Sequence, residues 1–214
     1  FATGPYVGKE GIIKPTYVPQ RTPKADAIKA AADLITKAWR PVFYTGGGVI
    51  NSGPRASEKL RELQELTGFP VTSTLMGLGA FPASHPDWLG MLGMHGSFEA
   101  NNAMHDCDLM ICVGARFDDR VTGRIDAFSP KSRKIHIDID ASSINKIVRV
   151  DVPVVADCAE ALDALIVEIK ALKREMPDLT AWRDQIDTWR ARRCFTYKNS
   201  SAVIKPQYAV ERLY

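Results

Sequence analysis

Residues 108–116, Asp-Leu-Met-Ile-Cys-Val-Gly-Ala-Arg, combine an unbroken apolar run with a glycine and then a cation. A run that is apolar at every position predicts a strand buried on both faces, which is typical of a parallel sheet. Similar short runs rich in apolar or β-branched residues occur at 41–45, 71–74, 88–92, 134–138 and 152–155. Because helical patterns separate most of these runs, we predict a doubly wound α/β fold with helices on both faces of the sheet.

Two of the helical patterns make local predictions that a structure can test. The first helix is predicted to open at Thr22 and Pro23 and to end before Pro41. Its apolar spacing predicts a buried stripe made of Ile28, Ala31, Ala32, Ile35 and Trp39. A later helix is predicted to start at Asp157, which would form a capping box with Glu160.

Composition excludes several classes of protein. The chain has 214 residues, with 28 Lys and Arg against 25 Asp and Glu, so its net charge is only +3. This excess is too small to indicate a nucleic-acid surface. No apolar run approaches the roughly 20 residues that span a bilayer, and the start lacks a signal-peptide pattern. The four cysteines form no CxxC pair, which favours free thiols in a reducing cytoplasm. The first residue is Phe1, so we expect a piece of a longer chain.

Glycines follow the first predicted strand directly, at Gly46, Gly47 and Gly48. Residues without Cβ atoms let backbone N–H groups approach a phosphate, although a tight turn that binds nothing has the same pattern. The nicotinamide fingerprint G-x-G-x-x-G is incomplete, because Asn51 stands where the third glycine belongs. The second strand ends at Thr74, with no acid to bind a ribose, so this pattern does not favour a standard NAD site.

Charged residues gather after the strand at 108–113, in Arg116, Asp118, Asp119 and Arg120. They have two interpretations: solvated charges that pair with one another, or guanidinium groups that bind an anionic cofactor. We favour the second, because ligands of doubly wound sheets bind beyond the carboxyl ends of the strands.

The next strand carries His136, Asp138 and Asp140 in alternation, which predicts that the three side chains share one face. Three such positions spread over about 13 Å, too far for one metal ion, so we predict no metal site. Asp138 is the better candidate for a ribose-binding acid. Asp157 is interpreted as a helix cap, with a nucleotide hydroxyl as a further partner. Because no catalytic triad, HExxH or P-loop pattern occurs, we predict a nucleotide-binding domain without catalytic residues.

Longer stretches resemble a known family. They are Gly-Leu-Gly-Ala-Phe-Pro at 77–82, Met-Leu-Gly-Met-His-Gly at 91–96, Gly-Ala-Arg-Phe-Asp-Asp-Arg-Val-Thr-Gly at 114–123, Ile-His-Ile-Asp-Ile-Asp at 135–140 and Ser-Ile-Asn-Lys at 143–146. These stretches are similar to the catalytic large subunits of the acetolactate synthase (acetohydroxyacid synthase) family, thiamine-diphosphate enzymes that decarboxylate pyruvate and join it to a second 2-ketoacid in branched-chain amino acid biosynthesis. The matching part of that family is its central domain, a Rossmann-like six-stranded parallel sheet that binds FAD.

The resemblance implies a set of FAD contacts and a substrate channel in this sequence. The implied FAD contacts are Arg21, Gly46, Gly47, Gly48, Thr74, Leu75, Met94, His95, Gly114, Ala115, Arg116, Asp118, Arg120, Val121, Asp138, Ile139, Asp157 and Cys158. The implied channel residues are Met94, Asp119 and Arg120. Ser143 stands where some members carry Asn, which makes a contact there doubtful.

The resemblance also implies how the chain is organised. Residues 1–20 would be an interdomain linker, 21–175 the FAD-binding domain, and 176–214 a helix and a linker towards a carboxyl-terminal domain. Thiamine diphosphate and Mg²⁺ would bind only in the full-length enzyme, so the fragment alone is predicted to be inactive. Implied partners are the flanking domains, further copies of the subunit as a dimer or tetramer, and a small regulatory subunit. Two alternatives remain: a stand-alone nucleotide- or NAD-binding domain, and the central domain of another thiamine-diphosphate carboligase or oxidase.

Overall fold

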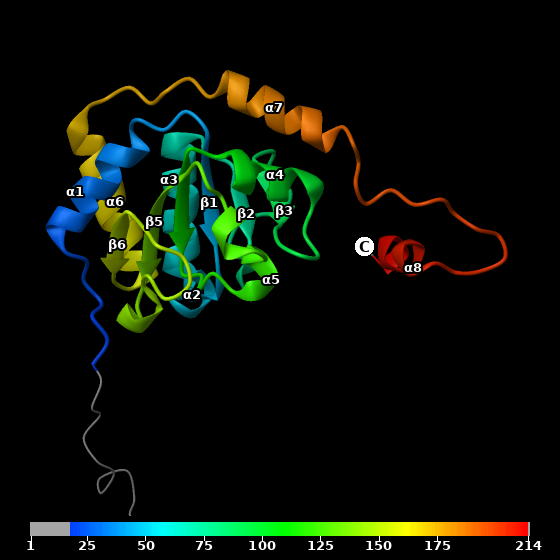
Figure 1. The fold of residues 1–214 in the computed structure, drawn as a ribbon, viewed down its shortest axis with the longest axis horizontal. Coiled ribbons are helices and arrows are strands. Elements are labelled where there is room, and N and C mark those ends of the chain that lie inside the picture. Colours follow the sequence, from blue (N-terminus) through cyan, green and yellow to red (C-terminus); the bar gives the residue numbers. More distant parts are fainter. Residues whose placement is uncertain (1–17, 214) are drawn as a thin grey trace, which may run out of the picture.

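The computed structural model describes residues 18–213, so most of the predicted linker at 1–20 lies outside the described residues. Within this part, six strands form one sheet in which every neighbouring pair is parallel. The strands are β1 (Pro41–Thr45), β2 (Val71–Ser73), β3 (Trp88–Met91), β4 (Leu109–Val113), β5 (Arg133–Asp138) and β6 (Val152–Val155). Their spatial order is β3-β2-β1-β4-β5-β6 (Figure 1). The predicted doubly wound α/β fold is confirmed.

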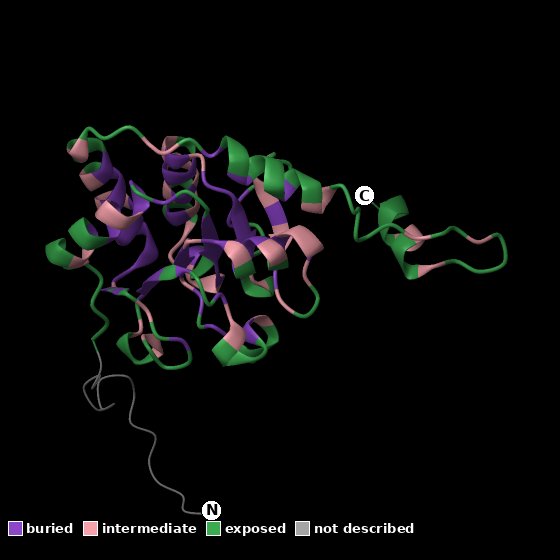
Figure 2. Ribbon diagram, turned by 45° about the horizontal axis from the view of Figure 1, so that its top comes forward, coloured by how far each residue is buried: buried purple, intermediate pink, exposed green. Residues whose placement is uncertain are grey.

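Helices cover both faces of the sheet. The helices α1 (Ala25–Ile35), α3 (Pro54–Thr67) and α6 (Cys158–Leu172) share one apolar core with alternate strand residues such as Phe43 and Ile111. On the other face, α4 (Phe98–Asp106) and α7 (Thr180–Arg190) pack with the intervening residues such as Met110 and Cys112. This division follows from the two-residue period of a strand, which sends successive side chains to opposite faces. Figure 2 shows the buried strands between these more exposed helices.

Helix α7 closes the amino edge of the sheet, along the top of Figure 1. The Trp182 indole N–H donates to the carbonyl oxygen of Pro41 at 3.0 Å, at the start of β1. The Arg190 guanidinium donates to the carbonyl oxygen of Trp88 at 2.9 Å, at the start of β3. The opposite, carboxyl edge carries shorter elements: α2 (Gly47–Asn51), α5 (Asp119–Thr122) and the 3-10 turns Leu75–Gly77 and Ala141–Ser143, while a third 3-10 turn, Ile125–Ala127, lies on the connection from α5 to β5.

The predicted start and stripe of the first helix are partly wrong. Helix α1 begins at Ala25 after Lys24, with no side-chain cap, so Thr22 does not cap it. It ends at Ile35, and Trp39 beyond it is 62% exposed rather than buried. The reason lies outside the helix: the backbone N–H groups of Trp39 and Arg40 donate to the carboxylate of Asp108, which turns the chain into β1.

Other local predictions were also only partly right. Asp157 caps α6 as predicted, but Glu160 does not complete a capping box. Its carboxylate instead accepts from Arg55 at 2.9 Å, because α3 lies alongside α6. The predicted linker after the last core helix contains a further helix, α8 (Pro206–Leu213). None of the helices within 18–213 is long and apolar enough to cross a membrane.

Candidate functional site at the carboxyl edge of the sheet

A cavity of about 620 Å³ opens at the carboxyl edge of the sheet. It lies where the chain reverses its direction of winding, because β2 and β3 extend to one side of β1 whereas β4, β5 and β6 extend to the other. The strand order 3-2-1-4-5-6 is that of dinucleotide-binding folds, whose ligands lie across this crevice. A volume of this size is within the range of small-molecule and cofactor sites.

Most of the residues implied by the family resemblance meet at this cavity. Those that line it are Gly47, Gly48, Thr74, Leu75, Gly114, Ala115, Arg116, Asp118, Arg120, Val121, Asp138, Ile139, Asp157 and Cys158. They come from the ends of β1, β2, β4, β5 and β6, which the parallel arrangement brings to one edge. The predicted residues that do not line the cavity are Arg21, Gly46, Met94, His95 and Asp119.

Glycine allows the loops after β1 and β4 to touch through their backbones. A Cβ atom on Gly46 would lie 2.2 Å from the carbonyl oxygen of Gly114, and one on Gly48 would lie 2.6 Å from the Gly114 Cα. The Gly48 N–H donates to the Gly114 carbonyl at 2.9 Å. Gly46 therefore lies at the contact between the two loops and outside the cavity lining, whereas Gly47 and Gly48 line the cavity.

Two arginines supply positive charge to the cavity wall. Arg116 lies 3.6 Å from the Asp118 carboxylate, and its side chain is 77% exposed. Because an exposed pair of this kind is weak, Arg116 can leave Asp118 for a stronger anion. A hydrogen bond from the backbone N–H of Arg120 lowers the pKa of Asp118, and a hydrogen bond with the Asp119 side chain lowers it further. Asp118 also caps the short helix α5. The Arg116–Asp118 pair fits the first interpretation of this charged segment, and Arg116, Asp118 and Arg120 line the cavity, as the second interpretation requires.

Acidic groups line the opposite end of the cavity. Asp138 ends β5, and its carboxylate accepts from the Asp140 N–H at 2.8 Å. Asp140 lies beyond the strand, so the predicted alternation of three side chains along one strand stops at Asp138. Asp157 caps α6 by accepting from the Ala159 N–H at 3.0 Å. Burial raises the pKa of Cys158 to about 12, so this thiol stays protonated at neutral pH.

The residues outside the cavity are held at its margin. Arg21 reaches the Asp157 carboxylate at 3.4 Å while its side chain remains 70% exposed. Met94 and His95 belong to the loop after β3, and the Met94 N–H donates to the Arg120 carbonyl at 2.8 Å. This bond places the loop beside α5, next to the arginines of the cavity wall.

Sequence reasoning predicted Gly47 and Gly48 of α2 but missed the part of the cavity wall that follows them. Ile50, Asn51 and Ser52 line the cavity, and the Ser52 hydroxyl donates to the Asp157 carboxylate at 2.6 Å. A five-residue helix rich in glycine gives no periodic signal that would predict it. Further lining residues not predicted from the sequence are Tyr44, Met76 and Asp140, and Ser143 lines the cavity as well. Within 18–213, no group of three His, Cys, Asp or Glu side chains is placed to hold a metal ion.

Comparison with known proteins agrees with this geometry. Residues 28–165 match the family model described as thiamine pyrophosphate enzyme, central domain. The chain belongs to this family. The matched residues include all six strands and the cavity wall, so the fold and the site both fall within the family's domain.

Similar curated proteins carry one activity in their names. The chain is 42% identical to the acetolactate synthase isozyme 3 large subunit of Escherichia coli (strain K12), over 98% of this chain and 37% of that protein. It is 45% identical to the acetolactate synthase large subunit of Corynebacterium glutamicum and 46% identical to the acetolactate synthase of Mycobacterium leprae, in each case over 93% of this chain and 32% of the relative. The chain thus spans about a third of the length of these relatives.

Proposed function

We propose that this central domain binds FAD in the cavity at the carboxyl edge. The observation that carries the proposal is the distribution of charge, with two arginines on one wall and two buried carboxylates, Asp138 and Asp157, at the other end. Guanidinium groups match phosphate oxygens, and a carboxylate at a strand end accepts hydrogen bonds from ribose hydroxyls. A dinucleotide presents these two kinds of group side by side.

The length of the cavity favours a dinucleotide over a single nucleotide. Its wall runs from Thr74 and Leu75 after β2 to Asp157 before α6. Five neighbouring strands, β2, β1, β4, β5 and β6, lie along this wall. Four interstrand spacings of about 4.8 Å make a span of about 19 Å. An extended molecule with two ring systems and a charged middle suits a site of that length.

The ends of the cavity support FAD with its adenosine towards β5. Thr74 at the end of β2 offers no carboxylate, whereas the two buried acids of the cavity lining, Asp138 and Asp157, stand at or just after the ends of β5 and β6, which is the reverse of the usual NAD arrangement. Near β2, Leu75 and Met76 are 68% and 75% exposed and line the cavity. Exposed apolar side chains at this end suit the large flavin ring, which has far more apolar surface than nicotinamide.

We further propose that the longer protein is an acetolactate synthase. In that reaction pyruvate is decarboxylated and joined to a second 2-ketoacid. Thiamine diphosphate, held through Mg²⁺ by other parts of the protein, would supply the carbanion chemistry when bound. This domain would bind FAD and pack against its flanking domains without turnover of its own. The support is the identity of 40–46% to proteins of that name, and we expect a cytoplasmic homodimer or tetramer with a regulatory small subunit.

FAD titration of the full-length protein tests the proposed site. Arg116→Gln removes a guanidinium from the cavity wall and is expected to weaken FAD binding by about tenfold, the loss of one hydrogen bond to a charged group. Arg124→Gln is the matched control, because Arg124 is 80% exposed and lies outside the cavity lining. Flavin fluorescence reports both affinities. Tighter binding of NAD than of FAD, or equal losses in the two variants, would contradict the proposal.

A further inference from the structure

Three buried side chains form a row beneath the cavity, on the sheet face covered by α4 and α7. Tyr44 of β1 is the register partner of Cys112 of β4, and Cys112 is the partner of His136 of β5. All three are fully buried. The loop after β4 folds back over this row, so that the Phe117 ring lies 5.6 Å from the Tyr44 ring and 5.0 Å from the His136 ring, centroid to centroid.

The row holds this loop through one carbonyl group. His136 Nε2 lies 2.8 Å from the Ala115 carbonyl oxygen, and the Cys112 thiol donates to the same oxygen at 3.3 Å. Because a carbonyl oxygen only accepts, Nε2 carries the proton in this tautomer. The same nitrogen lies 3.7 Å from the Asp138 carboxylate. His136 therefore connects the loop that carries the arginines with the acid at the other end of the cavity.

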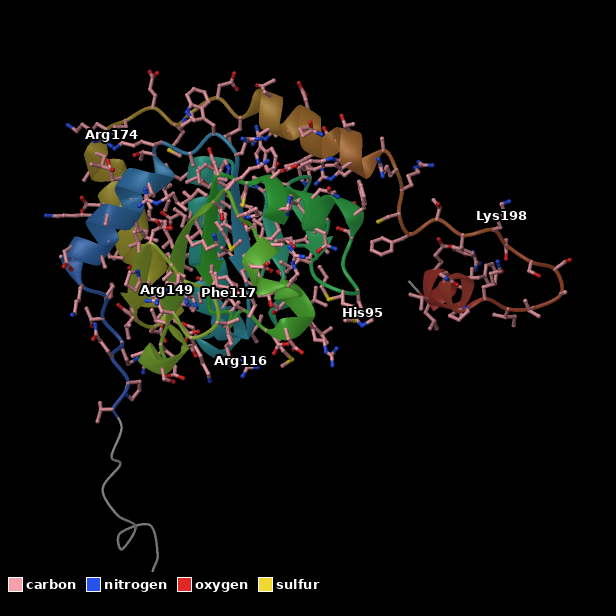
Figure 3. The ribbon with its side chains drawn as sticks, in the orientation of Figure 1. His95, Arg116, Phe117, Arg149, Arg174 and Lys198 are labelled. Carbon is pink, nitrogen blue, oxygen red and sulfur yellow. The ribbon has the colours of Figure 1, made fainter. Side chains whose placement is uncertain are left out.

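The held loop has a conformation that needs support. Phe117 has a φ of 55°, in the left-handed region that residues other than glycine rarely adopt. This turn directs Phe117 onto the sheet, where it is 1% exposed, and leaves the Arg116 and Asp118 side chains 77% and 48% exposed. Figure 3 shows Phe117 inside the domain and Arg116 at its lower rim. The position of the Arg116 charge at the cavity thus depends on a strained turn, and the buried side chains of the sheet beneath it hold that turn in place.

We infer that His136 is a positioning residue for the cofactor site, an inference that rests on the proposed FAD function. By donating to the Ala115 carbonyl it holds the 114–118 loop in the turn that presents Arg116 to the cavity. His136 does not line the cavity itself, so it acts through this loop. Its other nitrogen, Nδ1, is buried without a hydrogen-bond partner among the described residues. For core stability alone a histidine is unfavourable at this position, because Nδ1 loses its hydrogen bond to water on burial and gains no described partner in exchange.

Two substitutions in the full-length protein separate positioning from stability. His136→Leu removes the donor together with the unpaired nitrogen, so the thermal midpoint is expected to stay close to that of the wild type. Its FAD affinity is expected to fall by about tenfold, because the loop loses one hydrogen bond and a tenfold change in affinity corresponds to about the free energy of one such bond. His136→Gln retains an N–H donor at the end of a flexible side chain and is expected to recover most of the affinity. His105→Leu, at an exposed position on α4, is the control.

Hydrogen exchange in the FAD-free protein gives a readout that does not depend on the cofactor. Faster exchange confined to residues 114–121 in His136→Leu, and wild-type exchange there in His136→Gln, would support the inference. Exchange and FAD affinity both unchanged in His136→Leu would overturn it. Faster exchange spread over β4, β5 and α6 would also overturn it, because that pattern indicates a structural role. If the wild-type protein binds no FAD, the proposed function fails and the exchange data alone decide whether His136 positions the loop.

Discussion

Replacing Gly46 with Ala tests the contact on which the cavity is built. The added Cβ would lie 2.2 Å from the Gly114 carbonyl oxygen, 2.6 Å from the Ala115 Cβ and 2.7 Å from the Ala115 Cα. These are mostly backbone atoms that cannot swing away, so the loops after β1 and β4 must separate. Gly46 has a φ of −124°, which alanine adopts without strain. The penalty is therefore steric alone.

The expected cost follows from other cases of overpacking. Forcing one extra methyl group into a packed site costs about 1–3 kcal/mol, and close contact with two backbone atoms and the Ala115 Cβ indicates the upper part of that range. A loss of about 2–3 kcal/mol corresponds to a fall in Tm of about 4–12 °C for a chain of this size. The separated loops would also weaken FAD binding, because Gly48 and Arg116 lie on either side of the contact.

Gly47→Ala is the matched control. A Cβ there would lie 3.2 Å from the Met76 Cβ and 3.4 Å from the Met76 carbonyl oxygen, so the short turn Leu75–Gly77 has to shift only slightly, and the position is the first of helix α2. We expect a change within about 0.5 kcal/mol. Thermal and urea unfolding followed by far-UV circular dichroism measure both variants. Equal stability of Gly46→Ala and Gly47→Ala would refute the close contact of the two loops.

Three further predictions concern stability, pH and thiol reactivity. Asp157→Ala removes the cap of α6 and the partner of Ser52, so urea unfolding should show a loss of about 1–2 kcal/mol, whereas an unchanged midpoint would contradict the cap. Hydrogen bonds from Lys59 and then Arg55 lower the pKa of Asp163 in the folded state, so this group contributes stability above its unfolded pKa that is lost as the pH falls through its folded pKa. In Asp163→Asn the free energy of unfolding should fall less steeply below about pH 4 than in the wild type, as measured by urea unfolding at several pH values. An unaltered pH profile would oppose the lowered pKa of Asp163. Under native conditions iodoacetamide should modify Cys194 first, because it is exposed while the other three cysteines are buried, and mass spectrometry of labelled peptides would show any earlier modification elsewhere.

The sequence alone was sufficient for the elements whose local pattern is strong. Strands such as Leu109–Val113 are apolar throughout, and a helix such as α3 carries a buried stripe and ends at Gly68 in the left-handed conformation. These are short-range effects of burial, propensity and chain ends, which neighbouring residues largely determine. The alternation of such elements was also sufficient to predict the fold class and the edge of the sheet at which the cavity lies.

Only the tertiary structure decided which groups meet at that edge. Ser52 and Asp157 are 105 residues apart, and no local pattern links the hydroxyl of one to the carboxylate of the other. Trp39 was predicted to be buried because its spacing fits a helix, but Asp108 of a distant segment turns the chain and leaves it exposed. The sequence shows His136 only as one of three polar residues that alternate along a strand, whereas its contact with the Ala115 carbonyl depends on a loop that folds back across the sheet face. Contacts of this kind arise from the packing of whole elements, so their geometry is absent from the order of the residues.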